Sequence, residues 1–118
     1  MQNLETINND ILSKEMSKIQ LEELLIEYLQ EIEETRVTLE IIRIDTESHV
    51  YNDPEYKNEK ARSSEVKKRL SNTSYYSEQS NIVNGSAFVV KKKELRIKTL
   101  RKEIDHLKRL LQIKMIKE

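Results

Sequence analysis

Cysteine is absent from the 118-residue sequence, and proline and glycine occur only once each, as Pro54 and Gly85. Without cysteine, disulfide frameworks, thiolate metal sites and cysteine nucleophiles are excluded. A chain with so few turn-forming residues favours a small number of long helices over many short strands. Tryptophan is also absent and phenylalanine occurs once, so we expect burial along seams between helices rather than in a compact globular core.

Long hydrophobic runs are also missing. No apolar segment approaches the roughly 20 residues that a membrane-spanning helix needs. The first ten residues lack the basic start and the hydrophobic stretch of a secretion signal. We therefore expect a soluble, cytoplasmic protein with no membrane partner.

What the sequence does contain is a heptad pattern at each end. Over residues 4–42, steps of three and four connect one series of positions, most of them apolar, and a second series covers residues 90–111. The first series is Leu4, Ile7, Ile11, Lys14, Lys18, Leu21, Leu25, Tyr28, Ile32, Thr35, Leu39 and Ile42. The second is Val90, Lys93, Ile97, Leu100, Ile104, Leu107 and Leu111. This spacing is typical of coiled-coil helices, each of which needs a partner to bury its stripe.

The heptads and the turn signals divide the chain into three segments. Residues 1–45 are predicted to form an acidic coiled-coil helix, and residues 86–118 a basic one. Residues 46–85 are predicted to be a polar connector. Within it, Asn52-Asp53-Pro54 indicates the start of a short basic helix over about 54–71. Asn84-Gly85 is the strongest turn signal and is expected to precede the last helix.

The expected fold is all-α, with long amphipathic coiled-coil helices that form an elongated helical hairpin or an oligomeric bundle. Because a single chain is expected to leave too much of each stripe exposed, we predict a homo-oligomer. Parallel and antiparallel pairing both fit the pattern. The predicted oligomer interface consists of Leu21, Leu25, Tyr28, Ile32, Leu39, Ile42, Ile97, Leu100, Ile104, Leu107 and Leu111.

The formal net charge of zero conceals a segregation of charge along the chain. Residues 1–48 hold twelve acidic and four basic side chains, for a net charge of −8, whereas residues 49–118 hold seventeen basic and nine acidic ones, for +8. A basic helix attracts either nucleic acid or an acidic partner. The candidate nucleic-acid-binding residues are Lys67, Lys68, Arg69, Lys91, Lys92, Lys93, Arg96, Lys98, Arg101 and Lys102.

Signals for catalysis are few. The only glycine cannot make a phosphate-binding glycine loop, and the two histidines, His49 and His106, have no spacing that indicates a metal site. Each histidine is better explained as a solvated polar residue. We therefore predict no catalytic residue, no metal, no cofactor and no enzymatic activity.

One stretch resembles a family. The segment from Asn52 to Arg62, followed by Val66, Arg69-Leu70 and a basic helix ending in residues 106–111, is similar to small coiled-coil proteins encoded by phages and prophages of low-GC bacteria. The similarity covers about the C-terminal two-thirds of the chain. It implies an accessory role in DNA replication or recombination, in the host-cell cytoplasm if the chain is phage-encoded. Asn84-Gly85 departs from the continuous helix that the resemblance implies.

Two classes of function follow. The preferred hypothesis is a non-enzymatic nucleic-acid-binding accessory factor for a phage or mobile element, acting as an oligomer on single- or double-stranded DNA. The alternative is a protein-interaction module, such as an adaptor, assembly chaperone or inhibitor, without nucleic-acid binding. The direction of the basic side chains discriminates between them. If Lys91, Lys92, Arg96, Lys98 and Lys102 lie against the acidic first helix, the alternative gains.

Overall fold

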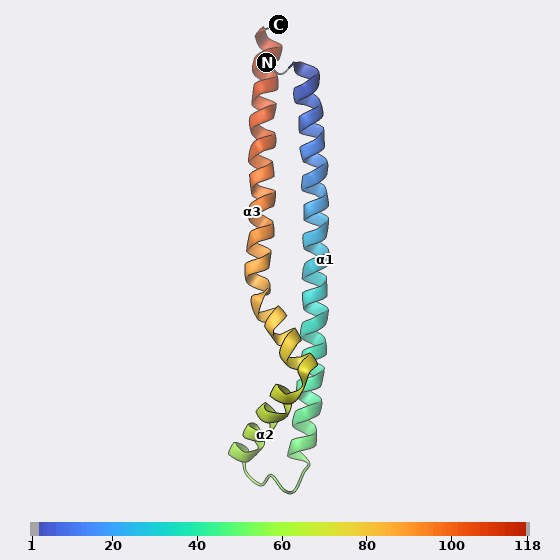
Figure 1. Ribbon diagram of the computed structural model, residues 1–118, viewed down its shortest axis with the longest axis vertical. Coiled ribbons are helices and arrows are strands. Elements are labelled where there is room, and N and C mark those ends of the chain that lie inside the picture. Colours follow the sequence, from blue (N-terminus) through green and yellow to red (C-terminus); the bar gives the residue numbers. More distant parts are fainter. Residues whose placement is uncertain (1–2, 118) are drawn as a thin grey trace. The chain divides into compact units, whose positions relative to one another are not determined.

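The computed structural model describes residues 3–117, which form three helices and no strand. They are α1 (Leu4–Tyr51), α2 (Glu59–Asn72) and α3 (Ser74–Lys117), shown in Figure 1. The predicted all-α fold is thereby confirmed. Residues 1, 2 and 118, which the predicted segments 1–45 and 86–118 include, lie outside the described residues.

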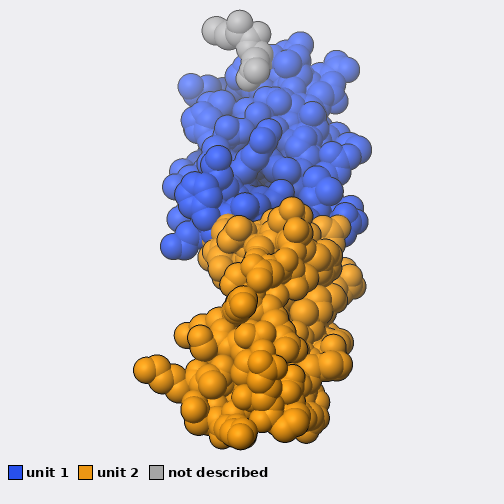
Figure 2. Space-filling model, turned by 60° about the horizontal axis from the view of Figure 1, so that its bottom comes forward, with its two compact units in different colours: residues 1–29, 88–118 blue, residues 30–87 orange. Residues whose placement is uncertain are grey.

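The chain packs as two compact units (Figure 2). Unit 1 contains residues 1–29 and 88–118, so it pairs the start of α1 with the end of α3. Unit 2 contains residues 30–87, with the rest of α1, all of α2 and the start of α3.

Unit 1 is an antiparallel helix pair. Ile7 and Ile11 of α1 form one buried cluster with Ile104 and Leu107 of α3, and Leu110 and Leu111 pack against it. At the other end of the pair, the Lys93 ammonium lies 5.5 Å from the centre of the Tyr28 ring. Early residues of α1 therefore meet late residues of α3. Both heptad series face the seam between the two helices, as their periods predict.

Polar residues in and beside this seam are paired. Lys14, at a seam position of α1, donates to Glu103 of α3 over 3.1 Å, and the Lys108 ammonium lies 3.1 Å from a carboxylate oxygen of Glu15. The hydrogen bond and the charge of Glu103 raise the pKa of Lys14 above its usual value. These two ion pairs join opposite helices, so they favour the observed register and direction.

In unit 2, α1 continues six residues beyond the predicted boundary at residue 45. The reason is Val50, which is fully buried with Val66 and Leu70 of α2. A helix that ended near residue 45 would not carry Val50 into this buried cluster with α2. Tyr56 and Tyr76 pack against the same cluster.

The helix α2 begins at Glu59, five residues later than predicted from Pro54. Its N-cap is Asn58, whose side-chain oxygen accepts the Ala61 N–H over 2.8 Å. The preceding residues make turns instead, in which the Glu55 N–H donates to the Asp53 carboxylate. Arg62 closes the corner because its Nε donates to the Tyr56 carbonyl oxygen over 3.1 Å.

The predicted turn at Asn84-Gly85 is wrong. Both residues lie within α3, which begins at Ser74, and Gly85 has no positive φ. Continuing the second heptad series backward from Val90 gives Ser86, Val83, Gln79 and Tyr76, all of which are buried or half-buried. A continuous stripe on α3 therefore outweighs the local turn preference of two residues.

The structure also changes the interpretation of the predicted oligomer seams. Within the single chain, Ile32, Leu39, Ile97, Ile104 and Leu107 are buried, and the other six predicted interface residues are half-buried. The expectation that one chain leaves these stripes exposed is wrong, because the chain buries them on itself. Association with a second chain stays a prediction and requires another surface.

The seam supports a prediction on stability. Ile104→Ala should lower the free energy of unfolding by about 2–5 kcal/mol, because it removes a side chain that is only 4% exposed. The control is Ile116→Ala in the same helix, where the side chain is 85% exposed and the change should stay within about 0.5 kcal/mol. Urea unfolding monitored by circular dichroism measures both. Equal effects would contradict the seam.

Gly85 provides a second prediction. A Cβ added at this glycine meets no atom within 4 Å. Gly85→Ala should therefore stabilise the chain by about 0.5–1 kcal/mol, because alanine has the higher helix propensity. Thermal unfolding measures the change. A loss of stability would show that this position is a turn after all.

Candidate nucleic-acid interface

The strongest candidate site is the outward face of α3 within unit 1. Burial of Ile97, Ile104 and Leu107 in the seam fixes the rotation of this helix. Positions of α3 opposite the seam residues therefore point away from α1, whereas positions beside the seam, such as Glu103 and Lys108, reach it. Four lysines occupy this outward side and are exposed, and we call them the basic face: Lys91, Lys92, Lys98 and Lys102.

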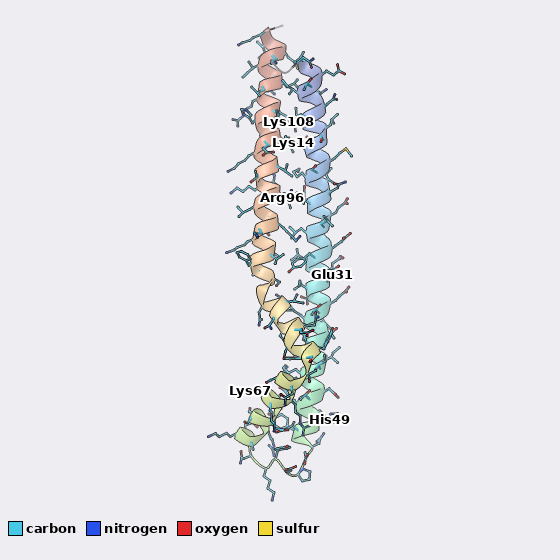
Figure 3. All side chains as sticks on the ribbon, in the orientation of Figure 1. Lys14, Glu31, His49, Lys67, Arg96 and Lys108 are labelled. Carbon is cyan, nitrogen blue, oxygen red and sulfur yellow. The ribbon has the colours of Figure 1, made fainter. Side chains whose placement is uncertain are left out.

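The basic face has no carboxylate partner among residues 3–117. No ion pair of the described chain involves Lys91, Lys98 or Lys102, and Lys92 instead lies 5.7 Å from the centre of the Phe88 ring. The ion pairs between α1 and α3 use Lys14 and Lys108 (Figure 3). Lys98 and Lys102 border α1 through open pockets, beside Glu22 and beside Asp10, but no ion pair joins them to it in the described chain.

Acidic residues interrupt this surface at one place. Glu94 is exposed between Lys91 and Lys98, and the three side chains line a shallow open pocket together with Leu95. Lys98 also lines a second shallow pocket, beside Glu22 and Arg101. The local field remains positive, since lysines and arginines outnumber carboxylates over residues 91–102.

Other predicted binding residues have different surroundings. Arg96 and Arg101 are exposed on α3, beside the basic face, and have no carboxylate within ion-pair distance in the described chain. Lys93 differs because it is half-buried at the seam against Tyr28. Its ammonium is therefore less available to a ligand than the lysines on either side of it in the sequence.

The candidates in α2 belong to unit 2. Lys67 and Lys68 are exposed, and Lys67 lines an open pocket of about 600 Å³ with Leu70, Tyr76 and other residues. Arg69 is engaged within the fold. Its Nε donates to Glu65 over 2.9 Å, and its guanidinium lies 5.8 Å from the centre of the Tyr56 ring. The hydrogen bonds of Arg69 raise its pKa, and Arg69 in turn lowers the pKa of Glu65.

The segment that carries the family resemblance is mainly structural in this chain. Asn58 caps α2, Arg62 donates to the backbone of Tyr56, and the Tyr51 hydroxyl donates to Glu59 over 2.8 Å. These contacts explain why this polar stretch holds a defined corner. Because these side chains are engaged within the fold, they are not free to contact a ligand.

Sequence reasoning did not include Phe88 and Leu95 in the site. Both are exposed, at 66% and 62%, within the basic face. They lie seven residues apart and therefore on the same side of the helix. The spacing of seven residues can be read from the sequence. It could not identify an exposed pair, because the sequence alone does not show which side of α3 faces away from the seam.

The described chain shows neither a cluster of three metal-ligating side chains nor a helix long and apolar enough to span a membrane. His49 is exposed, and its Nδ1 lies 2.9 Å from the Asp45 carbonyl oxygen in its own helix. His106 is exposed and lines a shallow pocket beside Asp10 and Lys14. Each histidine thus has a solvated position.

The absence of intrachain partners for the basic face supports a prediction on stability. The double substitution Lys91→Gln with Lys98→Gln should leave the free energy of unfolding within about 0.5 kcal/mol of the natural chain, because no ion pair is lost. Chemical unfolding measures this at low and at high salt. A clear loss of stability would reveal a contact that these lysines make within the fold.

Comparisons with known proteins found no matching protein-family model, no matching curated protein and no matching solved structure.

Proposed function

We propose that this chain is a non-enzymatic accessory factor that binds the phosphate backbone of nucleic acid through the basic face of α3. The observation that carries the proposal is the exposure of Lys91, Lys92, Lys98 and Lys102 without a carboxylate partner in the described chain. Free cations on one side of a long helix suit phosphate contacts, which position a protein on nucleic acid without reading its sequence.

The dimensions of the face fit such a ligand. Lys91 and Lys98 are seven residues apart, which is about 10 Å along a helix axis. Lys102 extends the row by one further turn, about 6 Å. Phe88 adds an exposed aromatic ring at one end, and aromatic rings stack with unpaired bases. The face thus offers contacts to both the backbone and the bases of a single strand.

The alternative stays a protein-interaction module, such as an adaptor, assembly chaperone or inhibitor, without nucleic-acid binding. That hypothesis gains if Lys91, Lys92, Arg96, Lys98 and Lys102 all lie against the acidic first helix. No ion pair of the described chain joins them to α1, although Lys98 lines an open pocket beside Glu22 and Lys102 lines one beside Asp10. The role in phage or mobile-element DNA metabolism rests on the family resemblance alone.

A salt-dependent titration tests the proposal. The natural chain is titrated against labelled single- and double-stranded DNA at several salt concentrations, because counterion release makes phosphate-driven binding fall steeply with salt. Lys91→Gln with Lys98→Gln should weaken binding to all sequences alike and reduce the slope of log K against log salt by about 1.5. Fluorescence anisotropy measures both quantities.

The matched control is Lys57→Gln with Lys60→Gln. It removes the same charge from two exposed lysines of unit 2 that have no predicted role. It should leave most of the affinity intact. No binding of either DNA at low salt, or an equal loss in both double variants, would contradict a site on α3.

A further inference from the structure

An unpartnered apolar stripe runs along α1 on the side away from α3 in unit 1. Leu12, Met16, Ile19 and Ile26 are each more than half exposed, and their spacings of four, three and seven place them on one side of the helix. Figure 1 shows α3 running along one side of this part of α1, and the residues of α1 that pack on α3 include Ile7 and Ile11, outside the stripe. Scattered apolar residues are normal on a protein surface, but an aligned series indicates a contact.

The rim of this stripe is acidic. Glu23 and Glu27 lie on the same side as the stripe, and neither makes an ion pair in the described chain. They are four residues apart and repel each other on an isolated helix. The only basic residues of α1 in this unit, Lys14 and Lys18, are held by Glu103 and Glu22. The stripe and its rim therefore suit a partner that is basic and partly apolar.

The outward face of α3 has this composition. Phe88 and Leu95 are exposed and seven residues apart, as are Ile19 and Ile26 on α1. Lys91, Lys98 and Lys102 surround them with positive charge. Since α1 and α3 already contact each other through their seam sides, these two outward faces can meet only between different copies of the chain.

We propose that the outward face of α1 in one copy packs against the outward face of α3 in a second copy. Pairing α1 with α1 would place acidic rims together, whereas pairing α1 with α3 places Glu23 and Glu27 against lysines. Because the two outward faces of one copy point in opposite directions, the contact is head-to-tail: each copy binds one neighbour through α1 and another through α3. The proposal does not rest on the proposed function, since it concerns association in the absence of nucleic acid.

Nucleic acid and the second copy would both contact the lysines of α3, so they compete for this face. The competition depends on the proposed function, but self-association does not. Sedimentation without nucleic acid and titration with DNA therefore give separate results, and either proposal can fail while the other holds.

The first test compares two substitutions of equal exposure on one helix. Ile19 and Leu24 are both 52% exposed, but only Ile19 lies in the stripe. Ile19→Gln should raise the dissociation constant of self-association about tenfold or more, whereas Leu24→Gln should leave it near that of the natural chain. Sedimentation velocity over a range of concentrations measures the constants, and circular dichroism checks that both variants keep their helix content.

The second test reverses the charges. Glu23→Lys with Glu27→Lys makes the outward faces of α1 and α3 both basic, and Lys91→Glu with Lys98→Glu makes both acidic. Each variant alone should lose self-association, because every α1–α3 contact then joins like charges. A mixture of the two variants should assemble with the variants alternating, because every contact between unlike variants joins opposite charges. None of these four residues has an intrachain ion pair to lose in the described chain.

The expected results are a natural chain that self-associates, with a dissociation constant that rises with salt, and a mixture of the two charge-reversed variants that restores self-association. A single-chain mass at every concentration and at low salt would overturn the proposal. So would equal losses in Ile19→Gln and Leu24→Gln. A mixture that stays monomeric, or charge-reversed variants that each associate like the natural chain, would also overturn it.

Discussion

The seam between the two ends of the chain determines what the rest of unit 1 can do. Ile7 and Ile11 of α1 bury against Ile104 and Leu107 of α3, and this burial is the main favourable term available to a chain without a compact globular core. Once the seam is closed, the rotation of both helices is fixed. The lysines of α3 and the apolar stripe of α1 then point to solvent because the opposite sides of their helices are occupied.

Polar residues at seam positions make this pairing specific. A lysine has an aliphatic stem that can lie along apolar neighbours while its ammonium reaches a polar partner. Lys14 reaches Glu103, Lys18 reaches Glu22 in its own helix, and Lys93 reaches the Tyr28 ring. Only some of these contacts depend on the opposite helix. Lys14 and Lys93 make theirs in the observed antiparallel register, and a slipped or parallel pair would leave both without these partners.

The sequence predicted the helices and their buried sides because a heptad period is a local property. It did not predict what covers each stripe, since Ile32 or Ile97 has the same spacing whether it packs on its own chain or on another. The turn at Asn84-Gly85 was expected from two residues, yet a stripe from Tyr76 to Ile97 continues through them. Long-range packing outweighs local preference there.

For the candidate site, too, the sequence predicted the residue types but not their surroundings. Composition identified the cations of the last helix, but only the fold separates Lys93, which faces Tyr28, from Lys91 and Lys92, which face solvent. In α2, Arg69 was predicted to bind a ligand and is instead held by Glu65 and Tyr56. The charge of a side chain can be read from the sequence, whereas its availability depends on neighbours that are distant in the sequence.

The central claim is that α1 and α3 close the seam within one chain. Because the natural chain has no cysteine, Asn9→Cys with Gln112→Cys gives a unique pair of spin labels at two exposed positions of unit 1. Electron spin resonance should find one narrow distance distribution between the labels, because packed helices with axes about 8–10 Å apart hold both sites at a fixed separation, and dilution with excess unlabelled chain should leave it unchanged. A distance distribution that disappears on dilution, or one as broad as that of an unfolded chain, would contradict the intrachain hairpin.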